Sequence, residues 1–175
     1  MAMKPTFVER LILSNQYRIL EQLYPKERKD FAKAREIFEE GYESEYGSVT
    51  GHITDDKDVI TPEISHEVHD ILTMFEQLAR VYKGLKDKAG ISKDSLAFAG
   101  FDGNDPLEIK YMVYTRRLLD KKQRMRYATS VTRADDGGNS HTPRLQQYRE
   151  MVRKWQASAN RNELTKEDII RITKD

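Results

Sequence analysis

The longest uninterrupted amphipathic pattern in this chain runs from about residue 62 to residue 88. Along it, apolar side chains recur at the i, i+3, i+4, i+7 spacing that gathers them on one face of an α-helix. Thr61 and Pro62 stand at its start, as an N-cap residue and a first-turn proline. A helix of about 27 residues is roughly 40 Å long. We therefore expect it to be the central element against which the other segments pack.

The prolines support a helical reading of the whole chain. Two more of them, Pro106 and Pro143, begin predicted helices, Pro25 ends one, and Pro5 lies in the leading segment. None falls inside a periodic stretch, where a proline would break the helix. The sequence therefore predicts an all-α fold, a single-domain multi-helix bundle over residues 1–175 built on the helix at about 62–88.

Capping signals place the ends of several helices. Thr6 followed by Glu9, and Thr165 followed by Asp168, each have the spacing of a capping box. A threonine–proline pair at 142–143 predicts the start of another helix. The first helix has one richer apolar side, made of Val8, Ile12, Ile19, Leu20 and Leu23.

The composition limits the cellular compartments and the classes of partner that we expect for this protein. The net charge is +1, from 30 basic and 29 acidic residues, so the chain is not a polybasic protein. There is no cysteine, which excludes disulfides, thiolate nucleophiles and zinc–thiolate sites. No stretch approaches the ~20 apolar residues of a membrane helix. We expect a soluble cytoplasmic protein that does not enter a membrane.

The stretch at residues 98–106 combines aromatic, glycine and acidic residues between two helical patterns. Its D-G-N string resembles the opening of an EF-hand loop, whose later positions need oxygen ligands and a glycine. Counted from Asp102, those positions hold Pro106, Leu107 and Val113 instead. The calcium reading therefore fails, and the glycine spacing fits no phosphate-binding loop.

Two interpretations of this stretch remain. In the first it is a structural turn, in which Phe98 and Phe101 fill the core and Gly103 takes a positive φ. In the second it is a ligand or partner site that uses Asp102 and Asn104. The residue types do not choose between the two.

The catalytic and metal-binding patterns that we tested are incomplete. Glu63 and His66 mimic half of a di-iron motif, which needs a second Glu-x-x-His helix that the sequence lacks. No G-x-S-x-G nucleophile elbow is present. We therefore predict no catalytic residue, no metal and no cofactor, and we favour a protein that is not an enzyme.

A polar triplet, Ser14-Asn15-Gln16, interrupts the apolar first helix. Serine and asparagine are mediocre helix formers, so another interaction must offset their cost. Hydrogen bonding to a neighbouring helix is one explanation. A role facing a ligand is the other.

The densest basic region follows the helix that starts near residue 106. Basic residues interleaved with tyrosines can follow a phosphate backbone and stack on bases. A solvated helix face has the same composition, so nucleic-acid binding is an alternative hypothesis for Arg116, Arg117, Lys121, Lys122, Arg124 and Arg126.

Several strings, in order along the chain, resemble the YfbU family of bacterial proteins. They are R-L-I-L-S-N-Q-Y at 10–17, G-Y at 41–42, F-A-G-F-D-G-N at 98–104, and T-P at 142–143 with the Tyr148, Met151 and Trp155 that follow. The similarity covers nearly the whole chain and is looser at 48–60 and 127–140. The resemblance implies a helical, cytosolic bacterial protein, and it supplies no catalytic residue.

The leading functional hypothesis is a non-enzymatic module for protein–protein contacts that forms a homo-oligomer, because tyrosine-rich helices suit interfaces. Nucleic-acid binding is the second hypothesis, and a small-ligand or enzymatic site near Asp102 and Asn104 is the third. The candidate residues for a ligand or partner surface are Asn15, Tyr17, Asp102, Asn104, His141 and Trp155.

Overall fold

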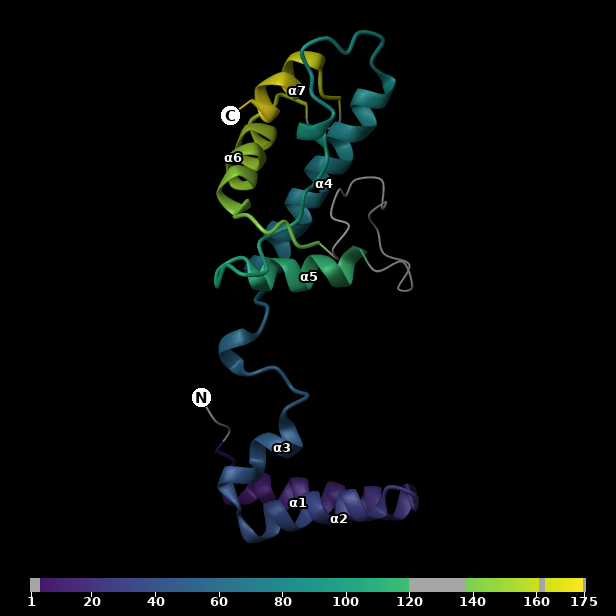
Figure 1. The fold of residues 1–175 in the computed structure, drawn as a ribbon, viewed down its shortest axis with the longest axis vertical. Helices are drawn as coiled ribbons and strands as arrows, with labels where there is room; N and C mark the ends of the chain where they lie inside the picture. The colour runs from purple at the N-terminus through teal and green to yellow at the C-terminus, as the bar shows by residue number, and fades with distance from the viewer. Residues whose placement is uncertain (1–3, 120–137, 161–162, 175) are drawn as a thin grey trace. The chain divides into compact units, whose positions relative to one another are not determined.

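The computed structural model describes residues 4–119, 138–160 and 163–174. Within these ranges the protein is all-α, as the proline and capping patterns predict, and contains no β-strand (Figure 1). Short 3₁₀ turns join some of the helices. The α-helices are α1 (Phe7–Leu23), α2 (Arg28–Glu40), α3 (Tyr46–Thr50), α4 (Pro62–Gly84), α5 (Ile109–Leu119), α6 (Leu145–Gln156) and α7 (Lys166–Thr173).

The chain divides into two compact units, an N-terminal unit of residues 1–59 and a C-terminal unit of residues 60–175. Each unit is described by itself, and the single domain over 1–175 stays a prediction. In the described ranges, no helix is both long enough and apolar enough to span a membrane.

The N-terminal unit is a hairpin of α1 and α2 followed by the short α3. The capping box starts α1 as predicted, since Thr6 N–H donates to the Glu9 carboxylate at 2.7 Å and Glu9 N–H donates to Thr6 Oγ1 at 3.3 Å. Gly41 ends α2 in the left-handed conformation, with φ of 75°. The small core of this unit consists of Ile37, Phe38 and Tyr46, with Leu13, Tyr17 and Val49 packed against it.

The C-terminal unit is organised around α4, as the long amphipathic pattern predicts. Helices α5, α6 and α7 all contact α4, which buries its apolar face against them (Figure 1). The fully buried members on α4 are Val68, Ile71, Leu72, Met74, Phe75 and Leu78. The predicted cap is present, because Thr61 Oγ1 accepts from Ile64 N–H.

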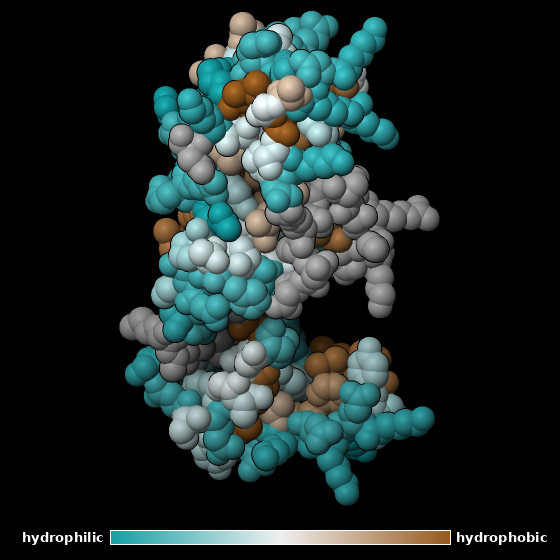
Figure 2. Space-filling model, turned by 45° about the horizontal axis from the view of Figure 1, so that its top comes forward, coloured by the Kyte–Doolittle hydropathy of each residue, from teal (hydrophilic) through white to brown (hydrophobic). Residues whose placement is uncertain are grey.

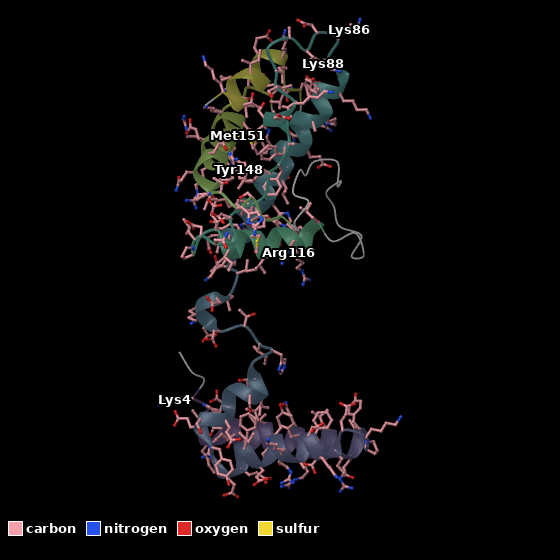
Figure 3. All side chains as sticks on the ribbon, in the orientation of Figure 1. Lys4, Lys86, Lys88, Arg116, Tyr148 and Met151 are labelled. Atoms are coloured by element: carbon pink, nitrogen blue, oxygen red, sulfur yellow. The ribbon has the colours of Figure 1, made fainter. Side chains whose placement is uncertain are left out.

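The end of α4 differs from the prediction. The helix stops at Gly84, not near residue 88, and Leu85 has extended backbone dihedrals with φ of −68° and ψ of 132°. Glycine costs ~1 kcal/mol relative to alanine inside a helix. Leaving the helix also lets Leu85 pack against the core. The side chains of Lys86 and Lys88 follow in the loop beyond α4 (Figure 3).

Candidate functional site

The aromatic residues of the 98–106 loop are core residues. Phe98 and Phe101 are both fully buried, which confirms that part of the structural interpretation. Their ring centroids lie 5.3 Å apart, and Tyr148 of α6 lies within 5.5 Å of each of them. Edge-to-face and tilted contacts between aromatic rings add ~1 kcal/mol per pair to the free energy gained by burying their apolar surface. The loop is thereby fixed to α6, which carries the buried Tyr148 (labelled in Figure 3).

The glycine prediction for this loop was wrong. Gly100, not Gly103, adopts the positive φ, at 98°. A Cβ at Gly100 would also collide with the carbonyl of Gly138, because the two chain segments run side by side there. Phe101 N–H donates to Gly138 O at 2.9 Å, and Ser140 N–H donates to Phe101 O at 3.0 Å. At Gly103 a Cβ would lie 2.7 Å from Met112 Sδ, so a substitution there would have to displace this side chain.

Glu108 is the polar centre of the loop. Its side chain is almost fully buried, at 3% exposure. One carboxylate oxygen accepts from Asp102 N–H at 2.8 Å, and the other accepts from Arg144 N–H at 2.8 Å and Leu145 N–H at 2.7 Å. A buried carboxylate is tolerable when it is hydrogen-bonded in this way. Glu108 therefore ties the loop to the N-terminus of α6.

The same contacts correct the predicted start of α6. The helix begins at Leu145, and its cap residue Arg144 makes no side-chain capping bond. Thr142 does not cap it, and the N–H groups of Arg144 and Leu145 instead donate to Glu108 from a distant part of the chain. A carboxylate at a helix N-terminus is also favoured by the helix dipole.

Three of the candidate site residues meet in this region. Asp102, at 6% exposure, accepts from Asn104 through both the backbone N–H at 2.9 Å and the side-chain amide at 3.2 Å. Asn139 Oδ1 accepts from Gly103 N–H and from His141 N–H, each at 3.0 Å. The bonds of Asp102 are local, and the bond from Gly103 to Asn139 joins the loop to a segment 36 residues further along the chain. A ligand role for Asp102, Asn104 and His141 stays a prediction.

Trp155 and Tyr17 have packing partners within their own units. Trp155 is 4% exposed and donates from Nε1 to Gln77 Oε1 at 3.0 Å. Tyr17 stacks on Phe38 with the centroids 5.9 Å apart, and burial raises the pKa of its hydroxyl. Both side chains thus support cores.

A charged cluster links three helices of the C-terminal unit. Arg149 of α6 donates to Glu67 of α4 at 2.6 Å, and Tyr111 of α5 donates to the same carboxylate at 2.6 Å. The hydrogen bond from Arg149 lowers the pKa of Glu67. Burial, followed by the bond to Glu67, raises the pKa of Tyr111 to about 12. A salt-bridged carboxylate and a protonated tyrosine make this cluster a structural brace. Sequence spacing gave no sign of it, because its members lie far apart in the chain.

No metal cluster is formed by the residues that the structure describes. In those ranges, no three His, Asp or Glu side chains are grouped as metal ligands. Glu63 and His66 of the partial di-iron motif both lie exposed on α4.

The polar triplet of α1 divides between two environments. Ser14 is buried and donates to Glu39 of α2 at 3.1 Å, so hydrogen bonding to a neighbouring helix is confirmed for this residue. Asn15 is exposed. Beside it lies a pocket of about 220 Å³, lined by Phe7, Arg10, Leu11, Ser14, Asn15, Arg18, Phe38 and Glu39.

The basic region is only partly described. Arg116 and Arg117 are exposed in the last turn of α5 (Figure 3), where cations favourably oppose the helix dipole. Lys121, Lys122, Arg124 and Arg126 lie outside the described residues. A nucleic-acid role for this region stays a prediction.

The comparisons with known proteins cover nearly the whole chain. The YfbU domain matches residues 2–174. The chain is also 36% identical over 169 residues to the UPF0304 protein MJECS11 of Methanocaldococcus jannaschii, an alignment that covers 94% of this chain and 96% of that protein. The resemblance alone implied a bacterial protein. This relative is archaeal, so such sequences are not confined to bacteria. The protein belongs to the YfbU domain family.

Proposed function

We propose that the protein is a non-enzymatic interaction module that associates with a second copy of itself through helix α1. The observation that carries the proposal is an exposed apolar surface on this helix. We call it the α1 apolar face, and it consists of Phe7, Val8, Leu11, Ile12, Ile19 and Leu23, each at least half exposed. Figure 2 shows apolar side chains gathered on one side of the N-terminal unit.

The packing of α1 against α2 explains why this face is left open. The side of α1 that meets α2 combines apolar residues, Leu13 and Tyr17, with polar and charged ones. Ser14 and Arg18 both bond to Glu39, and Glu21 of α1, which is buried, pairs with Arg35 of α2. Polar groups therefore occupy part of the buried side of α1, and six of its apolar side chains are left exposed. The richer apolar side that the sequence shows on this helix is thus its exposed side, apart from Leu20, which is half buried.

The size of the face suits an interface. Phe7 is 72% exposed and Leu23 is 65% exposed, at opposite ends of the helix. Together the six side chains offer on the order of 600 Å² of accessible surface, against ~800 Å² per partner in a standard interface. Isolated monomers rarely leave contiguous apolar patches of more than a few hundred Å² in water.

A second copy of this chain is the partner that fits best. The α1 apolar face carries no formal charge, although a third of the chain is charged, at 34%. In a two-fold dimer the same patch meets itself, so a charge near the two-fold axis would face its own copy. A neutral apolar patch is therefore self-complementary, whereas charged surfaces need a partner of the opposite sign.

Light scattering during size-exclusion chromatography tests the proposal. We expect a dimer at micromolar concentration, and a monomer for Ile19→Glu, because burying an unpaired carboxylate in an apolar contact costs several kcal/mol, or more than ~100-fold in affinity. The control is Leu107→Glu, which changes an exposed leucine of the C-terminal unit and leaves the dimer intact. A wild-type monomer at high micromolar concentration would contradict the proposal.

Two further expectations accompany this function. If a different protein bound the same face, adding that protein would reduce the amount of dimer measured by light scattering. The cytoplasmic location and the lack of a cofactor rest on the sequence alone and stay predictions.

A further inference from the structure

The α1 apolar face has an internal order that suggests how two copies meet. Phe7, Leu11, Asn15, Ile19 and Leu23 follow one another at intervals of four residues. They form a single ridge along the helix, since residues four apart are neighbours on an α-helix. Asn15 is the middle residue of α1, which spans Phe7–Leu23. Two apolar residues stand on each side of it, at equal distances.

We propose that two α1 helices pack antiparallel across a two-fold axis at Asn15, whose amide bonds to the Asn15 amide of the second copy. In this arrangement Phe7 meets Leu23 and Leu11 meets Ile19 of the other chain. The proposal rests on the self-association proposed above and adds its register and direction.

Asn15 has the properties that such a position requires. Its side chain is exposed, and in the part of the chain that the structure describes its amide makes no hydrogen bond. An asparagine amide has both donors and an acceptor, so two of them can pair reciprocally. A lone polar residue in an apolar seam lowers affinity but fixes register, because any shift leaves it buried without a partner.

The surface beside Asn15 provides places for the opposing side chains. A depression of about 220 Å³ includes Phe7, Leu11 and Asn15 in its lining. A second one of about 450 Å³ is lined by Asn15, Arg18, Ile19, Gln22 and Leu23. Antiparallel pairing places the ridge of one copy over the depressions of the second copy. Side chains of each copy can then insert between those of its partner. It also sets the two helix dipoles in opposition, whereas parallel pairing aligns like ends.

Single cysteines can read out this geometry, because the natural chain has none. With helix axes 8–10 Å apart and Cα atoms ~2.3 Å from each axis, residues that face each other at the two-fold axis have Cα atoms about 3.4–5.4 Å apart, a range that overlaps that of disulfides. Asn15→Cys should therefore form a covalent dimer under mild oxidation. Leu11→Cys alone should not, since its two copies would lie eight residues, or about 12 Å, apart along the helix.

A second measurement keeps Asn15 in place. Leu11→Cys mixed with Ile19→Cys should give a mixed disulfide dimer, identified by mass spectrometry, with little of either self-linked species. Self-linking of Leu11→Cys would indicate parallel helices and overturn the antiparallel register while leaving self-association standing. A wild-type dimer in which neither Asn15→Cys nor the mixture links would place the interface elsewhere and overturn this inference alone. A wild-type monomer would overturn both proposals.

Discussion

At the scale of single residues, the hydrogen-bond partners of Glu108 could not be predicted from the sequence. The sequence places it near a helix start, and local spacing predicts no more than a contact within that turn. In the structure its carboxylate accepts three backbone N–H groups, two of them from residues 36 and 37 positions away. Hydrophobic periodicity could predict that Phe98 and Phe101 are buried. It could not predict which distant amides a buried carboxylate would satisfy, because that depends on the tertiary fold.

We expect Glu108→Gln to destabilise the C-terminal unit. The substitution keeps the side-chain shape, but it turns one acceptor oxygen into a donor that faces backbone N–H groups. Leaving buried donors unsatisfied costs ~1–3 kcal/mol each, so the free energy of unfolding should fall by about 2–4 kcal/mol. Urea unfolding followed by circular dichroism measures the change. Glu167→Gln, at an exposed carboxylate, is the matched control and should change stability by less than ~0.5 kcal/mol. An equal effect of both substitutions would show that the buried carboxylate has no special role.

At the scale of elements, capping signals predicted the starts of α1, α4 and α7, a tertiary contact decided the start of α6, and α5 begins at Ile109 instead of at the predicted Pro106. The boxes at Thr6 and Thr165 and the cap at Thr61 appear in the structure as the sequence predicts. The start of α6 does not, because its free N–H groups are satisfied from α5's leading turn. The apolar periodicity of α1 identified its helical conformation, but it did not show which side would face α2.

The brace between α4 and α6 makes stability depend on pH. Because its partner Arg149 lowers the pKa of Glu67 below the ordinary value of 4.5, the folded state holds the carboxylate ionised when the unfolded state has begun to bind protons. This contribution is present above pH 4.5 and is lost as the pH falls through the lowered pKa. We expect unfolding free energy measured in this acid range to fall less steeply for Arg149→Met than for the wild type.

The control for this comparison is Arg153→Met on the same helix. Arg153 pairs with Glu150 on the exposed surface, where ion pairs contribute little. Its acid profile should therefore follow that of the wild type. Identical profiles for all three proteins would mean that the brace between Glu67 and Arg149 does not contribute to the acid response.

At the scale of the whole molecule, the sequence predicted the class of fold, and the structure adds two separate hydrophobic cores. The core around α4 draws its members from residues 64–172, and the small core of the hairpin draws its members from residues 13–49. Helical periodicity looks alike in both, and only contacts between distant residues reveal which helices share a core. The same holds for the candidate site. The sequence identifies its residue types, but it does not show which other residues they contact.

Two cores without a shared member have a consequence for melting. A segment of about 60 residues buries little surface and is marginal by itself, so the N-terminal unit should melt first and the C-terminal unit at a higher temperature. If α1 binds a second copy, only the lower transition gains from association, and its midpoint should rise with protein concentration. Calorimetry over a wide concentration range should show this rise for the wild type and not for Ile19→Glu. A single transition whose midpoint does not change with protein concentration would mean that self-association does not stabilise the N-terminal unit against heat.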